Sequence, residues 1–177
     1  LAPAASNKTL GVRLTGAPAV VSGLSLSYAL EYARQSDYAD GANIGADYWL
    51  GELGLKRGGW QLTGGYELLG ADDSAFSTPL ATGHAFNGWA DKFLATPADG
   101  LEDRYLRLDG SLADFKLSAR YHDFSADRGS ADYGSEVDLQ AARSFGDVTL
   151  LAKYASYNAD DFATDTDKFW LMAQVAF

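Results

Sequence analysis

The chain has 177 residues, and its 24 Asp and Glu against 14 Lys and Arg give it a formal net charge of −10. This acidic balance argues against a nucleic-acid partner, which requires a basic surface to neutralise phosphates. The sequence contains no Cys, which excludes disulfide bonds and thiolate metal sites. Its 9 Phe, 4 Trp and 10 Tyr are too many for a disordered acidic chain.

Nine segments alternate apolar and polar residues with a period of two, which is the signature of a β-strand. In chain order they are residues 9–16, 24–33, 47–56, 60–69, 103–110, 115–124, 135–145, 147–157 and 167–177. Most of them approach the ~9–11 residues that a tilted strand needs to cross a bilayer. None shows the 3.6-residue period of a helix, and no apolar run approaches the ~20 residues of a spanning helix. We therefore predict an all-β protein.

Short and long connections alternate strictly between these segments. The short ones cover residues 16–23, 57–59, 112–114 and 146–147, and the long ones cover 36–46, 72–100, 125–134 and 158–167. An antiparallel up-and-down meander with tight turns at one end and long loops at the other produces this order. A bacterial outer-membrane barrel has the same arrangement, with short periplasmic turns and long extracellular loops.

Alternation alone does not decide which face of the strands meets water. A soluble β-protein buries its apolar face, whereas an outer-membrane barrel turns that face to lipid and encloses the polar face. Aromatic residues near strand ends on the apolar face favour the membrane interpretation, because such rings gather at the lipid headgroups. They are Tyr32, Trp49, Tyr121, Phe145, Tyr154 and Phe177. We predict a transmembrane β-barrel in the bacterial outer membrane, formed by residues 1–177 as a single domain.

The strand count has a topological consequence. If the last strand ends in the periplasm, nine strands place the start of the first one outside the cell. Single-chain bacterial barrels have an even number of strands. We therefore expect this chain to be the C-terminal part of a larger barrel, of about 16–18 strands like typical porins. The alternative is that residues 9–16 do not span the membrane, which would leave a small closed barrel of eight strands.

Two stretches carry a resemblance to a known family. They are "FSTPLATGHAFNGWADKFLATPADGLEDRYL", residues 76–106, and the ending of the chain from residue 121 to residue 177. Both resemble proteobacterial outer-membrane porins of the alginate-export-like family, whose members are longer than this chain. The resemblance implies recognition of the last strand by the barrel assembly machinery, with roles for Phe177, Val175 and Trp170 or Leu171. Alginate transport itself does not carry over, because a path for polyuronates should present Arg and Lys and this chain is acidic.

Charged and polar residues in mid-strand are the candidates for lining a lumen. They are Arg13, Glu31, Glu52, Lys56, Glu67, Arg107, Asp109, Lys116, Arg120, His122, Asp138 and Lys153. The long connection at residues 71–101 either folds into the lumen as a constriction or caps the barrel mouth outside the cell. Its candidates for contact with solute are His84, Asn87, Trp89, Asp91 and Lys92. In the alternative interpretation Phe86, Trp89 and Phe93 pack this loop against the wall, and its polar residues only form hydrogen bonds.

Neither a metal site nor a catalytic centre is well supported. Asp160, Asp161 and Asp165 are close in sequence and are weak calcium candidates, but their spacing does not match an EF-hand loop. Ser118 and His122 share one strand face, but at ~3.3 Å per residue they lie about 13 Å apart, too far for a hydrogen bond. We therefore predict no catalytic residues, no cofactor and no enzyme activity.

The sequence favours a porin that lets small hydrophilic solutes or oligosaccharides diffuse passively through a water-filled lumen. The alternatives are a small barrel enzyme that acts on lipid and a non-conducting structural or adhesion barrel. The expected partners are outer-membrane lipid, lipopolysaccharide, the barrel assembly machinery and, as a possible oligomer, further copies of the chain.

Overall fold

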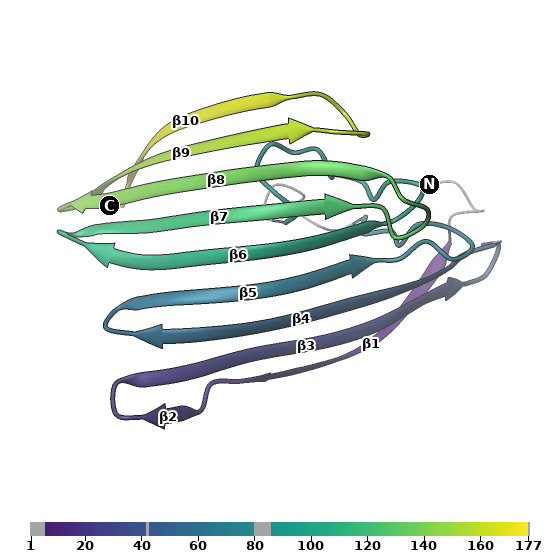
Figure 1. Cartoon of the computed structure of the whole chain (residues 1–177), viewed down its shortest axis with the longest axis horizontal. Coiled ribbons are helices and arrows are strands. Elements are labelled where there is room, and N and C mark those ends of the chain that lie inside the picture. The colour runs from purple at the N-terminus through teal and green to yellow at the C-terminus, as the bar shows by residue number, and fades with distance from the viewer. Residues whose placement is uncertain (1–5, 42, 80–85, 177) are drawn as a thin grey trace.

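The computed structural model describes residues 6–41, 43–79 and 86–176, which form one antiparallel sheet (Figure 1). Its strands are β1 (Asn7–Gly16), β2 (Ala19–Val21), β3 (Leu24–Asp37), β4 (Gly45–Arg57), β5 (Trp60–Leu69), β6 (Leu101–Leu112), β7 (Phe115–Ser125), β8 (Asp132–Phe145), β9 (Val148–Ala159) and β10 (Thr166–Val175). The described part of the chain contains no helix that is long and apolar enough to span a membrane.

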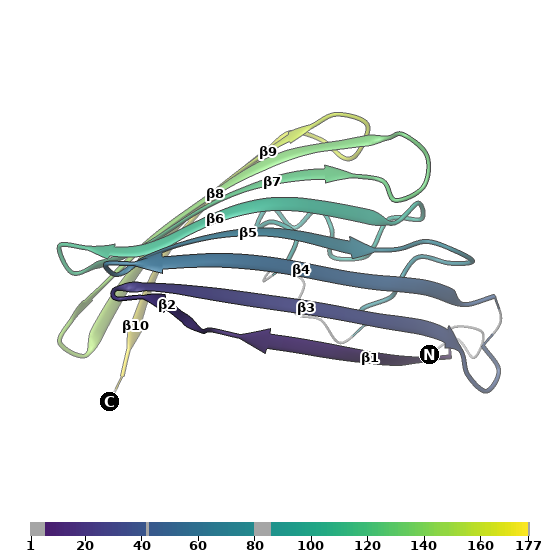
Figure 2. The same cartoon turned by 60° about the horizontal axis from the view of Figure 1, so that its bottom comes forward.

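The long strands pair in sequence order, β1-β3-β4-β5-β6-β7-β8-β9-β10, as the predicted meander requires. The alternation predicted each described strand except the short β2, which pairs back onto β3 within the first short connection. Short turns lie at one end of the sheet and long loops at the other. The described chain starts at the long-loop end and finishes at the short-turn end (Figures 1 and 2).

Several strands are longer than the sequence predicted. β3 and β8 have 14 residues each, so they extend beyond the predicted segments into the long connections. The added residues are mostly polar, and backbone pairing with a neighbouring strand continues where the apolar alternation has ended. Pairing of β1 with β10 does not occur among the described residues, so the sheet is curved but open.

The two faces of the sheet differ as an outer-membrane barrel requires. Leu10, Val12 and Leu171 are 82%, 69% and 75% exposed on the convex face, although they belong to regular strands. Buried polar side chains such as Gln35, Asp103 and Asp138 lie on the opposite, concave face. A soluble β-protein would bury the first group, because each exposed Leu forfeits about 1.5–3 kcal/mol of transfer free energy in water. The fold is therefore the inverted one of an outer-membrane β-barrel wall.

Aromatic residues on the convex face cross the sheet diagonally. Successive cross-strand partners connect Tyr154 on β9 to Leu55 on β4. Leu55 is six residues closer to the short turns than Trp49 on the same strand. Tyr66 and Tyr121 take intermediate positions on β5 and β7. Six residues at ~3.3 Å each across five strand spacings of ~4.8 Å correspond to a strand tilt of roughly 40°. The strands of outer-membrane barrels are tilted by about 35–45°. At that tilt the aromatic row is parallel to the plane of the membrane.

Candidate functional site on the concave face

All of the residues predicted to line a lumen lie on the concave face. The register of the strands places Arg13, Glu31, Glu52, Lys56, Glu67, Arg107, Asp109, Lys116, Arg120, His122, Asp138 and Lys153 there. Alternation is sufficient for this result, because side chains two residues apart on a strand share a face.

The register also sorts these charges along the strands. The row nearest the long loops is mainly acidic. Glu31 and Glu67 are both paired with Leu50, Glu67 is paired with Asp103, and the cation in this row, Arg13, forms a 2.6 Å ion pair with Glu31. Four residues nearer the short turns, Arg107 is paired with Arg120. The next row contains Lys56, Asp109 and Lys153. The concave face is thus mainly acidic toward the long loops and richer in Arg and Lys toward the short turns.

His122 is held in the middle of this face by a buried carboxylate. Its Nδ1 lies 2.9 Å from both carboxylate oxygens of Asp103 on the neighbouring strand, and both side chains are almost completely buried. The His122 ring stacks on Phe124 with a centroid separation of 5.4 Å. Ser118, the other member of the discounted catalytic pair, lies four residues away along β7. The contact with Asp103 supports a structural role for His122.

Two tyrosines that the sequence analysis left out of the candidates belong to this site. The Tyr48 hydroxyl donates to Glu67 Oε1 at 2.6 Å, and the Tyr105 hydroxyl donates to Glu52 Oε1 at 2.7 Å. Asp103 and Glu136 were also left out. The two tyrosines could have been predicted from the sequence, because they occupy polar-face positions of the alternating pattern. On that face a Tyr hydroxyl can donate a hydrogen bond to a carboxylate.

Residues 86–100 of the long connection pack against the concave face, and Asn87 and Ala90 are hydrogen-bonded to it. Asn87 Nδ2 donates to Glu67 Oε2 at 2.8 Å, and the Ala90 backbone N–H donates to Glu136 Oε1 at 2.7 Å. Between these anchors Gly88 has φ = 84°, and a Cβ there would lie 2.4 Å from Glu136 Oε2. Gly88 therefore allows both the left-handed backbone conformation and the close approach of the loop to β8.

Cations on the wall surround Trp89 of the loop. Lys153 Nζ lies 3.8 Å from the ring centroid, and Arg120 Cζ lies 4.9 Å from it, so both groups are placed for cation–π attraction. Trp89 is only 4% exposed. On the next strand Lys168 forms a 2.7 Å ion pair with Asp91. Two of the predicted constriction-loop residues, Trp89 and Asp91, therefore contact lumen-facing cations directly.

Aromatic packing fixes the following part of the loop. The Phe93 ring centroid lies 4.5 Å from that of Phe124 and 5.3 Å from that of Phe162. Lys92 donates to the Thr166 hydroxyl at 2.7 Å. Phe86 is different, because it is 55% exposed. Of the three aromatic residues that the packing interpretation set against the wall, Trp89 and Phe93 are buried there and Phe86 is not; His84 lies outside the described residues.

Cavities remain between the described part of the loop and the wall. One of about 200 Å³ is lined by residues of both signs, including Arg13, Glu52, Asp103, Arg107 and Arg120. Another of about 380 Å³ lies toward β1 and is lined by Thr9, Glu31, Phe76 and Leu94, among others. Arg13, Tyr48, Glu67, Phe86 and Asn87 line both cavities. The loop thus leaves polar space beside the acidic row.

Two of the weak calcium candidates, Asp161 and Asp165, have other partners. Asp161 Oδ2 accepts a hydrogen bond from the Asp132 backbone N–H at 3.1 Å, and Asp165 Oδ1 accepts one from the Ala159 N–H at 2.8 Å. In the part of the chain that the structure describes, three His, Asp or Glu side chains do not come together in a way that would hold a metal ion. These contacts order the loop between β9 and β10 from within.

Comparison with solved structures identifies the fold. The chain superimposes on Pseudomonas aeruginosa OccK5 (OpdH) with a TM-score of 0.71 and 16% sequence identity over 94% of this chain and 49% of that one. For P. aeruginosa OccK9 (OpdG) the values are 0.71, 19%, 94% and 46%, and for P. aeruginosa OpdL they are 0.69, 19%, 94% and 52%. The chain therefore spans about half the length of these structures, which are outer-membrane porins. No family model and no curated protein sequence matches the chain, so the resemblance to alginate-export-like porins has no support from these comparisons.

Proposed function

We propose that this chain forms part of the wall of an outer-membrane porin through which small hydrophilic solutes diffuse passively. The observation that carries the proposal is the inversion of the two faces: Leu and Val side chains of regular strands are exposed outward, while charged side chains line the concave side. The fold shared with the Pseudomonas porins supports the same function. A lumen needs the charged rows to face water, and a lipid-facing wall needs the apolar residues to face hydrocarbon.

In this proposal residues 86–100 constrict the lumen. The loop is fixed to the concave wall at Asn87, Trp89, Ala90 and Asp91, so it narrows the path beside the acidic row. Asn87 and Phe86 line the cavities that remain and are placed to contact solute. The separation of acidic and basic rows gives the path a sign of charge that changes along its axis, which biases the entry of charged solutes.

The placement of residues on the convex face also supports proposals about the partners of the protein. Val175 is exposed on the convex face at the end of β10, where the assembly machinery could read it together with Phe177, which lies outside the described residues. Lipopolysaccharide contact and association with further copies belong to the convex face. We also propose membership of the alginate-export-like family, based on the resemblance of residues 76–106 and 121–177 to that family. We propose a channel rather than an enzyme, since the Nδ1 atom of His122 contacts the Asp103 carboxylate.

Conductance across a planar lipid bilayer tests this function. Purified protein added to one side should produce discrete, ohmic current steps in potassium chloride. A protein that inserts into vesicles and stays silent over many bilayers would contradict the channel and favour a plugged structural barrel. Hydrolysis of phospholipid that is lost in His122→Ala would favour the lipid-acting enzyme instead.

A further inference from the structure

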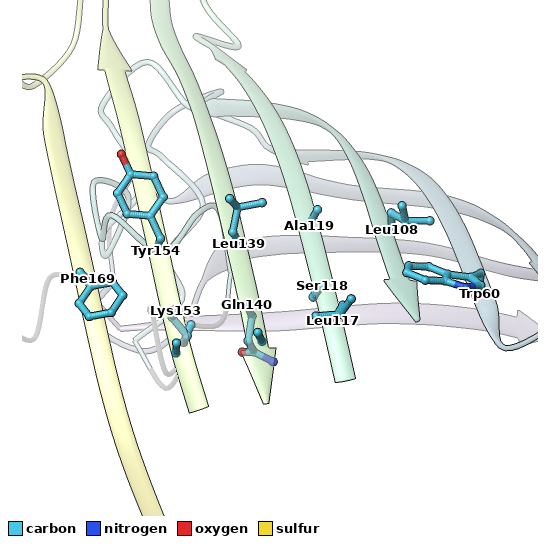
Figure 3. A pocket seen from close by; sticks show the side chains of 12 residues that line it. Trp60, Leu108, Leu117, Ser118, Ala119, Leu139, Gln140, Lys153, Tyr154 and Phe169 are labelled. Atoms are coloured by element: carbon cyan, nitrogen blue, oxygen red, sulfur yellow. The ribbon is translucent and has the colours of Figure 1, made fainter. Parts of the chain in front are cut away.

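The convex face carries a hollow whose floor is made of small residues. A groove of about 460 Å³ crosses β5–β10, and Figure 3 shows the rings of Trp60 and Phe169 at its two ends. Ala119, Ala141 and Ala152 contribute methyl groups where other parts of the convex face present Leu, Val or aromatic side chains. The lining is almost wholly apolar, and its volume falls in the ~300–1,000 Å³ range of small-molecule sites.

The groove follows the cross-strand register. Leu108, Ala119, Leu139, Tyr154 and Phe169 are successive partners on β6–β10, and Leu117, Ala141 and Ala152 form the parallel row beside them. At the β5 end, the Trp60 ring occupies the space that a side chain at Gly110 would need. Five strand spacings of ~4.8 Å make the groove about 24 Å long. Its shape therefore suits an extended hydrocarbon chain.

The strand tilt gives the groove a direction in the membrane. Tyr154 belongs to the diagonal aromatic row on the long-loop side, whereas Trp60 begins β5 immediately after the short turn at residues 58–59. The groove therefore climbs from the short-turn interface, which is periplasmic in outer-membrane barrels, toward the opposite interface. A lipid of the periplasmic leaflet would lie in it with its headgroup near Trp60.

One positive charge lies at that lower end of the groove. Arg57 is the cross-strand partner of Trp60 and is exposed on the same face. Arg143 follows Ala141 by two residues, and its guanidinium lies 5.1 Å from the Phe115 ring and 5.0 Å from the Phe145 ring. Its one ion pair among the described residues is a 3.4 Å contact with Asp114, which is 82% exposed and therefore weak. Arg143 on β8 is four strand spacings, about 19 Å, from Arg57 on β4, so one phosphate cannot contact both. The Arg57 cation beside the Trp60 end of an apolar groove matches a phosphate attached to an acyl chain.

We propose that this groove binds one anionic glycerophospholipid, with an acyl chain along Ala119, Ala141 and Ala152 and the headgroup phosphate at Arg57. The proposal rests on the membrane location that the proposed function assumes, but it does not depend on conduction. The site would retain a single lipid through detergent extraction, in contrast to the exchanging lipids around the rest of the wall.

Native mass spectrometry of the purified protein in detergent supplemented with phosphatidylglycerol or phosphatidylcholine tests this site. We expect one phosphatidylglycerol to remain bound and about fivefold less retention of phosphatidylcholine, the difference that one Arg contributes to attraction of an anionic lipid. Ala141→Trp fills the groove floor and should abolish the retained lipid. Ala173→Trp is the matched control, because it adds the same ring to an exposed position of the convex face on β10 that does not line the groove.

The charge is tested separately with Arg57→Gln, which should bring the retention of the two lipids to within about twofold. Arg143→Gln is the matched control, because it removes a cation of the same face about 19 Å away, and it should leave the difference between the two lipids unchanged. Equal retention by Ala141→Trp and the unsubstituted protein overturns the proposal. A change of oligomeric mass in Ala141→Trp also overturns it, since the groove would then be an interface between copies. Retained lipid in a protein that does not conduct leaves the lipid site standing and rejects the channel.

Discussion

The Nζ atom of Lys153 on β9 lies 3.8 Å from the centre of the Trp89 ring, which belongs to the long connection between β5 and β6. The contact joins a predicted constriction-loop residue to a predicted lumen residue 64 positions away in the sequence. Cation–π attraction is worth about 0.5–2 kcal/mol, depending on how far the pair is removed from water. The loop position therefore depends on a small number of such contacts.

Removal of the Trp89 ring should release the middle of the loop from the wall. In Trp89→Ala we expect a larger single-channel conductance, because the loop no longer rests against Arg120 and Lys153. Trp89→Phe keeps an aromatic face and should lie between the two values. Tyr38→Ala is the control for loss of an aromatic residue, since Tyr38 is exposed in the loop between β3 and β4 and does not line these cavities. Identical conductance in Trp89→Ala and the unsubstituted protein would show that the loop does not limit the path.

Gly88→Ala should displace the same loop by a different route. The added Cβ would meet Glu136 Oε2 at 2.4 Å and would also disfavour the positive φ. We expect noisier current traces and faster proteolysis within residues 71–101. Gly129→Ala is a matched control: its φ is also positive, at 88°, but a Cβ there meets no atom within 4 Å. If both variants behave alike, backbone strain alone, and not the contact with Glu136, explains the effect.

Charge on the concave face should set ion preference. Arg107→Gln removes a cation from the row it shares with Arg120, so the lumen becomes more negative and its preference shifts toward cations. The reversal potential measured across a potassium chloride gradient should move in the corresponding direction. Arg104→Gln removes the same charge from the convex face near the long loops and should move it less. An equal shift in both variants would contradict the assignment of faces.

Substitutions in the turn between β6 and β7 should increase the stability of the protein. Ala113 and Asp114 both have positive φ, at 49° and 68°, and so carry strain that Asn and Gly avoid at these positions. The double variant Ala113→Asn and Asp114→Gly should raise the free energy of unfolding by about 1 kcal/mol. Urea unfolding of the protein in phospholipid vesicles measures it. The turn at Gly58 and Gly59, with φ of 58° and 85°, already has favourable residues, and Gly58→Ala should be destabilising.

Much of the wall could be predicted because its determinants are local. The period of two assigned all nine long strands and both faces, and the rotation of short and long connections ordered the strands as a meander. Strand ends were less accurate: β3 and β8 continue past the apolar alternation because their backbones still find partners. β2 was not predicted, since three residues are too few to show a period.

The sequence by itself determined which side chains share a face, because successive residues of a strand must point to opposite sides. Only the tertiary structure decided where the long connection lies. Its anchors, Asn87 on Glu67 and Ala90 on Glu136, join residues 20 and 46 positions apart. Such contacts depend on the register of several strands at once, and no local pattern around residue 88 carries that information. The same reason explains why Asp103 and Glu136 emerged as parts of the site only when the strands were paired.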